Sequence, residues 1–334
     1  MGPSVTTAST ERPLAPRSAW HRLLAVASMV RYRFFLYAGL LPYLLGAAWA
    51  YSRAGMFDAI AFWSGLAGVV FAVVGVEAFN EYFDSRMGTD RVFNPADLPP
   101  MSDAVLWLGV AAFAIAFAVG IHLTLARGWP ILALALAGGA AAIFYVAPPI
   151  RWAYRGLGEL VIALSYGPWM VLGSLYLHTQ TLSKQALFAS LVPGCLIMAL
   201  AVVNAIPDYH QDRLVGKRNL VVRLGRKRAV WLYLALAAAG VAVVPVGVAL
   251  GVFPAPSLAA LLALPLLVKS GRAAITSYES PRAFVPAVRA IVACYLVAVL
   301  LFTAGILISG AGDLSTLLKS ELGGRITCRL NRPQ

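Results

Sequence analysis

The chain is built from long apolar stretches that are separated by short polar connections. Nine of these stretches are long enough to cross a bilayer as helices, for which about 20 apolar residues are needed. They cover residues 34–51, 58–80, 103–124, 129–149, 158–177, 186–206, 229–250, 252–269 and 288–310. The pattern therefore predicts an all-α, multi-pass membrane protein with nine transmembrane helices.

These stretches form one expected domain, which covers residues 31–310. Residues 1–30 are predicted to be a disordered N-terminal tail, because the first twenty are rich in Ser, Thr, Pro and Arg and lack the apolar core of a signal peptide. Residues 311–334 are predicted to form a C-terminal tail. No stretch is polar enough to suggest a separate soluble domain.

Composition and charge support a membrane protein and give its orientation. Hydrophobic residues make up 60% of the chain and charged residues 12%, roughly half the charged fraction of a soluble domain. With the N-terminus inside, 20 of the 27 Lys and Arg residues fall on the cytoplasmic side, as the positive-inside rule requires. We expect an integral protein of a prokaryotic plasma (inner) membrane. The bilayer is its partner, and this hydropathy excludes a nucleic-acid-binding protein.

Two polar motifs of the same form stand at the ends of two apolar stretches. Asn80-Glu-Tyr-Phe-Asp84 ends the second, and Asn204-Ala-Ile-Pro-Asp208-Tyr-His-Gln-Asp212 ends the sixth. Ionisable groups at such depth are costly and usually functional. Both stretches run toward the cytoplasm in the expected topology, so the two motifs should meet there. At about 100° per residue, each motif is expected to present one polar stripe, the second running from Asn204 to Asp212.

Opposing carboxylates of this kind favour a divalent cation and an anionic ligand. Mg²⁺ binds carboxylates together with phosphate oxygens and removes the repulsion between the acids. The motifs therefore predict a Mg²⁺ site for a diphosphate leaving group, where the metal neutralises the charge that grows as the carbon–oxygen bond breaks. Lys217 and Arg223, each close to a glycine, are the expected phosphate contacts among the basic residues of the following loop. Tyr82, Tyr145 and Tyr209 are candidates to shelter an electron-deficient carbon.

The motifs also resemble those of a known family. Asn80-x-x-x-Asp84-x-x-x-Gly88-x-Asp90 and Asp208-x-x-x-Asp212-Arg-x-x-Gly216-Lys217-Arg218 are similar to the paired motifs of the UbiA superfamily of intramembrane prenyltransferases. Tyr145-x-x-Pro148-Pro149, followed by Tyr154-Arg155-Gly156-Leu157-Gly158-Glu159, adds to the likeness, which covers about residues 30–310. The branch that prenylates 1,4-dihydroxy-2-naphthoate in menaquinone synthesis is the most similar. Glu81 departs from the pattern, since the family places Asp there.

The resemblance implies a nine-helix bundle around a central cavity. It also implies Mg²⁺-dependent transfer of a polyprenyl group from an allylic diphosphate to an aromatic acceptor, 1,4-dihydroxy-2-naphthoate or a related quinone precursor. Asp84, Asp208 and Asp212 would be the catalytic residues. The metal ligands implied are Asn80, Asp84, Asp90, Asp208 and Asp212. The substrate contacts implied are Asn80, Asn204, Lys217, Arg155, Arg223 and Tyr145.

Two alternatives remain open on the sequence. The acceptor of a prenyltransferase could instead be 4-hydroxybenzoate, homogentisate or a lipid. From another class, intramembrane acids also serve cation or proton-coupled transporters. Such relays usually place their charges near the midplane in broken helices, whereas the acids here cluster at one face.

Overall fold

The nine apolar stretches fold as helices. The computed structural model describes residues 33–87 and 102–330, and side chains within residues 38–87 and 102–310. The predicted tail at residues 1–30 and the loop that carries Asp90 lie outside the described residues. The helix that begins at Pro281 continues to Leu330, where the sequence predicts a C-terminal tail.

The described part of the chain is helical and contains no strand. The elements in chain order are α2 (Arg33–Ala54), α3 (Ala59–Met87), α4 (Asp103–Arg127), α5 (Trp129–Ile143), η1 (Trp152–Tyr154), α6 (Gly158–Leu164), η2 (Ser165–Trp169), α7 (Met170–Thr179), α8 (Lys184–Ala189), α9 (Leu191–Ala205), α10 (Tyr209–Leu214), α11 (Leu220–Leu224), α12 (Arg226–Ala249), η3 (Ala255–Ala263), α13 (Leu264–Ser277) and α14 (Pro281–Leu330).

Each predicted span corresponds to one of these helices or to a continuous run of them. Seven helical stretches of the described residues are long and apolar enough to cross a membrane. Three of the seven join shorter elements: α6 with η2 and α7, α8 with α9, and η3 with α13. The shorter α5 and the first helix, α2, account for the two remaining predicted spans.

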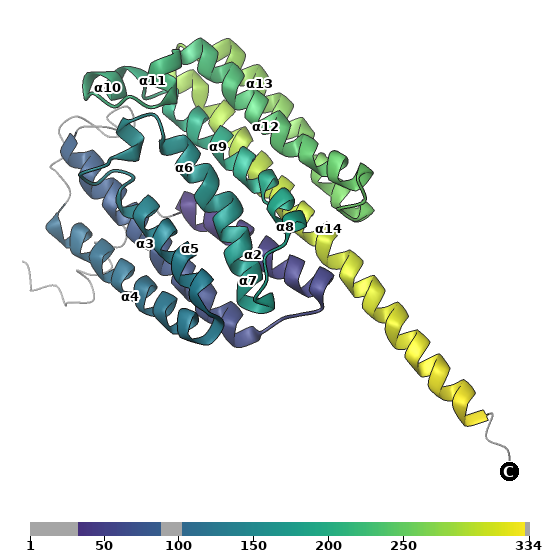
Figure 1. Cartoon of the computed structure of the whole chain (residues 1–334). Coiled ribbons are helices and arrows are strands. Elements are labelled where there is room, and N and C mark those ends of the chain that lie inside the picture. Colours follow the sequence, from purple (N-terminus) through teal and green to yellow (C-terminus); the bar gives the residue numbers. More distant parts are fainter. Residues whose placement is uncertain (1–32, 88–101, 331–334) are drawn as a thin grey trace, which may run out of the picture.

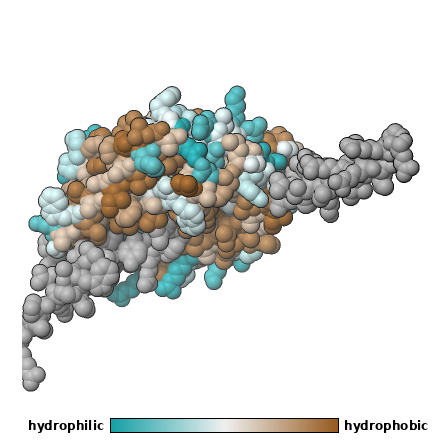
Figure 2. All heavy atoms as spheres, turned by 90° about the horizontal axis from the view of Figure 1, so that it is seen from below, coloured by the Kyte–Doolittle hydropathy of each residue, from teal (hydrophilic) through white to brown (hydrophobic). Residues whose placement is uncertain are grey.

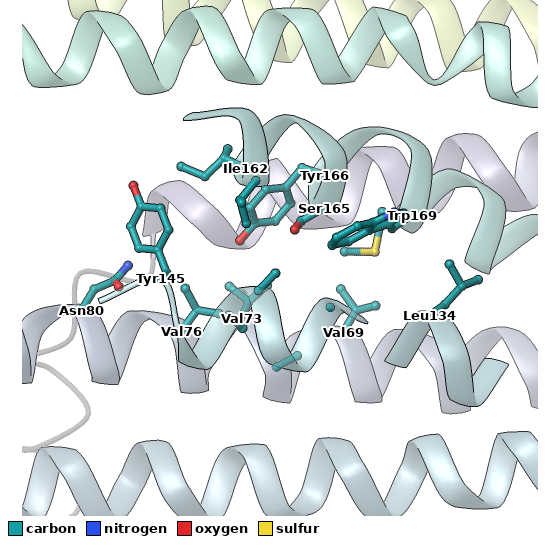
Figure 3. A pocket seen from close by; sticks show the side chains of 16 residues that line it. Val69, Val73, Val76, Asn80, Leu134, Tyr145, Ile162, Ser165, Tyr166 and Trp169 are labelled. Atoms are coloured by element: carbon teal, nitrogen blue, oxygen red, sulfur yellow. The ribbon is translucent and has the colours of Figure 1, made fainter. Parts of the chain in front are cut away.

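A π-helical turn interrupts the span formed by α6 and α7. It covers Ser165–Trp169 and contains Pro168, which has no backbone N–H to donate and cannot continue a regular α-helical ladder. Such single π turns widen a helix locally and are frequent at functional sites. Here the turn directs Tyr166 and Trp169 toward a cavity that is described below (Figure 3).

The helices form a bundle in which α12, α13 and α14 lie on one side and α3, α4 and α5 on the other (Figure 1). Helices α2, α6, α7 and α9 run between these two groups. Gly46 allows α2 to approach α7 closely, since a side chain there would collide with Val171 and Ser174. The Ser174 hydroxyl donates a 2.6 Å hydrogen bond to the Tyr43 carbonyl at the same contact, as small polar residues often do between membrane helices.

The outer surface of the bundle is strongly apolar. Large side chains such as Ile60, Trp107 and Leu125 are 77%, 68% and 85% exposed. Brown, hydrophobic residues also cover broad stretches of the face shown in Figure 2. An apolar exterior of this extent is suited to lipid rather than water. Together with the spanning helices, it identifies an integral membrane protein.

An ion pair joins the N-terminal end of α3 to the C-terminal end of α4. The Arg127 guanidinium, from the end of α4, donates to the Asp58 carboxylate. The same carboxylate accepts a 2.9 Å hydrogen bond from the backbone N–H of Ala61, and the Asp58 backbone N–H donates to His178 Nδ1 over 3.2 Å. One residue thus connects the ends of α3, α4 and α7, at the end of α3 opposite to Asn80 and Asp84.

Candidate functional site

The two predicted motifs face one another across a single cavity. This cavity has a volume of about 350 Å³ and is enclosed by α3, α6, α9, α10 and the first turns of α14. Its ionisable and amide side chains are Glu77, Asn80, Glu81, Asp84, Asn204, Asp208, Asp212 and Lys217, and Tyr145 also contributes to the wall. The juxtaposition predicted from the sequence is therefore present, and Glu81 takes part in it.

Helix α3 supplies one wall of the cavity. It remains helical as far as Met87, so Asn80 and Asp84 are one turn apart on the same face, as predicted. Asn80 Oδ1 is buried and accepts no hydrogen bond from any described residue. Glu77, one turn deeper, is 3% exposed. This wall therefore offers oxygen ligands to whatever fills the cavity.

The opposite wall differs from the continuous helical stripe that we predicted. Helix α9 ends at Ala205, and α10 begins only at Tyr209. Pro207 lies between the two helices, and proline disfavours helix both at its own position and at the preceding residue. A 2.8 Å hydrogen bond from the backbone N–H of Asp212 to the Asp208 carbonyl spans the start of α10. The three polar residues still reach one cavity, but from a helix, a turn and a second helix.

Asp212 is held by two neighbours from the loop that follows α10. The Asn219 side-chain amide donates to Asp212 Oδ2 over 2.6 Å, and Lys217 Nζ lies 3.6 Å from Asp212 Oδ1. Asn219 Oδ1 in turn accepts from the backbone N–H of Val222 and caps α11. Sequence reasoning missed Asn219. In the sequence, Asn219 directly precedes a short apolar segment. This position indicates a helix N-cap, but it does not indicate a contact with Asp212.

Glu159 ties the start of α6 to the same loop. Its carboxylate accepts a 3.0 Å hydrogen bond from the backbone N–H of Leu220, and its side chain is buried at 3% exposure. The contact fixes the loop that carries Lys217 and Asn219 against the bundle. Glu159 is therefore hydrogen-bonded to the loop at Leu220, and its side chain does not line the cavity.

Two of the predicted substrate contacts do not line the cavity. Arg155 and Arg223 are both exposed. The Arg223 side chain donates to the carbonyls of Arg218 and Arg155 over 2.9 and 2.6 Å. Its guanidinium thus connects the loop between α10 and α11 to the turn that precedes α6. Gly156, at φ 74°, leaves room for it, because a side chain there would collide with the Arg223 side chain.

Of the three candidate tyrosines, only Tyr145 reaches the cavity. The Tyr82 hydroxyl donates to Asp103 over 3.1 Å, and the Tyr209 ring lies under the Arg226 guanidinium. Burial raises the pKa of Tyr154, in the turn before α6, to about 12. The Tyr145 hydroxyl group is able to donate a hydrogen bond to a ligand in the cavity.

The donor set is suited to a hard divalent cation that is shared with a second ligand. Within the described residues, no three Asp, Glu, His or Cys side chains come close enough to hold a metal ion by themselves. The cavity nevertheless offers only oxygen ligands from its acids and amides, including the unengaged amide oxygen of Asn80. Mg²⁺ commonly binds through one or two carboxylates and completes its shell with phosphate oxygens and water. These residues fit that mode of binding.

An apolar hollow continues from the polar cavity. It has a volume of about 170 Å³ and shares Asn80, Tyr145 and Ile162 with the cavity wall. Figure 3 shows Asn80 and Tyr145 at one end of it and Leu134 at the other. The site therefore combines a polar end, where the acids gather, with an apolar extension along α3.

The chain has relatives among known proteins. The 1,4-dihydroxy-2-naphthoate octaprenyltransferase of Bacillus subtilis is 27% identical over 205 residues, which are 59% of this chain and 65% of the relative. The enzyme of the same name from Mycobacterium leprae is 31% identical over 242 residues, 68% of this chain and 78% of the relative. For the first of these relatives, the matched stretch thus spans slightly less than two thirds of its length.

Solved structures show the same fold. A UbiA homolog from Aeropyrum pernix K1 matches with a TM-score of 0.62 at 20% identity, over 83% of this chain and 98% of that one. A UbiA homolog from Archaeoglobus fulgidus bound to GPP and Mg²⁺ matches with a TM-score of 0.52 at 18% identity, over 83% and 99% of the two chains. The model of the UbiA prenyltransferase family matches residues 39–291. With its paired acidic motifs on one cavity of this helical bundle, the chain belongs to the UbiA prenyltransferase family.

Proposed function

We propose that the protein transfers a polyprenyl group from an allylic diphosphate to 1,4-dihydroxy-2-naphthoate or a related quinone precursor. The observation that carries the proposal is the single cavity that joins Asn80 and Asp84 to Asp208 and Asp212. Its apolar extension suits a hydrocarbon tail. The names of the relatives from Bacillus subtilis and Mycobacterium leprae support the choice of acceptor.

We propose Mg²⁺ as the cofactor, held by Asn80 and Asp84 on one wall and by Asp208 and Asp212 on the other. When bound, the metal would supply positive charge to a diphosphate leaving group. The Archaeoglobus fulgidus homolog bound to GPP and Mg²⁺ supports this assignment. Asp90 stays a predicted further ligand, since it lies outside the described residues.

The remaining residues of the cavity have roles that follow from their chemistry. Lys217 is 15% exposed and reaches the cavity beside Asp212, so its ammonium group is placed to contact phosphate oxygens. The amide N–H groups of Asn80 and Asn204 are able to donate to the same anion without adding repulsion. Tyr145 lies where the polar cavity meets the apolar hollow. There its ring is placed to shelter the carbon from which the diphosphate departs.

Apolar side chains complete the wall of the polar cavity. Ile162, Ile197 and Leu200 line the inner side of the cavity and exclude water from the carbon where positive charge develops. An electron-rich ring carbon of the acceptor would then attack in place of water, and a proton or the carboxyl group would leave that ring carbon as the diphosphate departs. Arg155 and Arg223 are proposed to hold the loop, since they lie outside the cavity. We propose that the site opens to the cytoplasm of a prokaryotic cell, because the basic residues cluster at that end.

The proposal is tested with the purified protein in nanodiscs. It is incubated with geranylgeranyl diphosphate, Mg²⁺ and 1,4-dihydroxy-2-naphthoate, and the prenylated product is sought by mass spectrometry. We expect product with Mg²⁺ and none after chelation with EDTA. Parallel reactions with 4-hydroxybenzoate, homogentisate and a glycerol phosphate lipid decide between acceptors. Absence of product with every acceptor, together with ion flux in liposomes, would support a transporter and overturn the proposal.

A further inference from the structure

The apolar extension of the site does not end at Leu134. A second hollow, of about 280 Å³, follows the first and shares with it Val69, Ala72, Leu134 and Gly138. It is enclosed by α3, α4, α5 and α7 and reaches Gly65 and Leu177. The polar cavity, the first hollow and the second hollow therefore form one series along α3. We call the two apolar hollows the tail channel.

The length of the tail channel is given by α3, which lines it from Asn80 to Gly65. Val76, Val73 and Val69 follow Asn80 along one face of α3, as Figure 3 shows. At 1.5 Å per residue, Val69 lies ~16 Å from the level of Asn80, and Gly65 lies ~22 Å from it. An extended chain advances ~1.2 Å per bond, so an isoprene unit with four chain bonds covers ~5 Å. The channel is therefore long enough for about four isoprene units.

The walls of the channel suit a hydrocarbon and not the acceptor. Two of the polar groups at its far end already have partners: the Tyr43 hydroxyl donates to the Phe62 carbonyl over 2.7 Å, and Ser174 donates to the Tyr43 carbonyl. An aromatic acceptor with hydroxyl and carboxyl groups would lose its hydration there and gain no hydrogen bonds in exchange. A prenyl tail has no such groups. Because the channel begins at Asn80 and Tyr145, a tail attached to a diphosphate in the cavity enters it directly.

Gly138 lies at the junction of the two hollows. It lines both, together with Ala72 and Val69, which lie ~12 and ~16 Å from the level of Asn80. A methyl group added at Gly138 would meet no atom within 4 Å, and the same is true of Gly139. Glycine in a helix interior is less stable than alanine. These glycines leave open space at the point where a third isoprene unit would pass.

We propose that Gly138 determines how long a prenyl chain the tail channel accepts. This inference rests on the proposed function, because it places the diphosphate in the polar cavity. A chain of two isoprene units, ~10 Å long, ends before the junction. A chain of four units, ~20 Å long, extends beyond it. A large side chain at Gly138 therefore blocks long substrates and spares short ones.

The experiment compares geranyl diphosphate with geranylgeranyl diphosphate in Gly138→Phe. We expect kcat/KM for geranylgeranyl diphosphate to fall at least about 10-fold, as overpacking a filled channel requires, while the value for geranyl diphosphate stays within about 3-fold of wild type. Gly138→Leu gives a smaller block, and it replaces the first variant should Gly138→Phe fail to fold. Ala140→Phe is the matched control, because Ala140 is on the same helix but exposed on its outer side. It should leave both values unchanged.

A binding measurement separates this inference from the proposed function. Native mass spectrometry of the wild type and of Gly138→Phe with each diphosphate needs no acceptor and no turnover. Selective loss of geranylgeranyl diphosphate binding supports the tail channel, even if no product forms with any acceptor. Equal binding and turnover of both diphosphates in Gly138→Phe and Gly138→Leu would overturn it, whether or not the wild type is a prenyltransferase.

Discussion

Asn219 holds Asp212 in the wall of the polar cavity. Its side-chain amide donates a 2.6 Å hydrogen bond to Asp212 Oδ2, while its own oxygen caps α11 through the backbone N–H of Val222. Both residues are buried, at 4% and 1% exposure. One side chain thus fixes the direction of an acid and the start of the helix behind it. Asp212 is a proposed Mg²⁺ ligand, and groups that orient such ligands commonly affect metal affinity strongly.

Asn219→Ser separates these two roles. Serine is as good a helix cap as asparagine, but its shorter side chain does not extend to Asp212. We expect α11 to stay folded and the protein to lose about 1–3 kcal/mol of stability with the buried hydrogen bond. The Mg²⁺ concentration for half-maximal activity should rise roughly 10-fold or more. A titration of prenyl transfer with Mg²⁺ measures the effect. An unchanged Mg²⁺ requirement would show that Asp212 needs no support from Asn219.

Removal of one acid from either wall should abolish turnover. We expect Asp84→Ala and Asp208→Ala each to lower kcat by at least about 100-fold, because each removes a proposed ligand of the Mg²⁺ that neutralises the diphosphate. Circular dichroism and gel filtration in detergent should show a folded protein in both cases. Asp103→Ala is a suitable control, since that carboxylate is 71% exposed and pairs with Arg86. Full activity of either cavity variant would remove that acid from the mechanism.

Arg223→Lys tests whether this arginine binds substrate or holds the loop. Lysine keeps the charge but does not reproduce the two hydrogen bonds to the carbonyls of Arg218 and Arg155. We expect a loss of about 1 kcal/mol in stability, because the contacts are exposed, and an unchanged KM for the diphosphate. Gly156→Ala should cost more, because it displaces Arg223, meets the Arg218 carbonyl and strains a backbone at φ 74°. A large rise in KM with unaltered stability would instead make Arg223 a substrate contact.

The ion pair at the far end of α3 predicts a pH dependence of stability. The backbone N–H of Ala61, followed by the Arg127 guanidinium, holds the pKa of Asp58 below its usual range. The folded-state pKa is thus lower than the unfolded value of about 3.9, so the contribution is complete above that pH. It is lost as the pH falls through the folded-state pKa. Thermal melts of the wild type between pH 7 and pH 3 should show this decline.

Asp58→Asn is the variant that isolates this effect. It should melt at a lower temperature than wild type at pH 7 and lose part of the decline at acidic pH. Because the pair is partly exposed, high salt should reduce the difference between the two proteins. Identical melting curves at every pH would show that the pair contributes nothing to stability.

The sequence by itself determined the class of fold and the principal acids. Apolar stretches of about 20 residues lead to spanning helices wherever they occur, because a backbone in lipid must satisfy its hydrogen bonds internally. Asn80 and Asp84 share a helical face because their spacing is one turn. The repetition of that spacing at Asn204 and Asp208, with the basic residues gathered on the same side, was enough to expect the two motifs to meet.

Only the tertiary structure decided how the second motif reaches the cavity and what surrounds it. Pro207 breaks the helix that periodicity alone would continue, and Asp212 arrives on a separate helix. The hydrogen-bond partners of Asp212 and Arg223 come from loops. Loop conformations depend on contacts between distant segments, and no hydrophobic periodicity in the sequence predicts them. The tail channel likewise arises where α3, α4, α5 and α7 meet around Gly138. A sequence shows that such a residue is small, but only packing shows that the space beside it stays open.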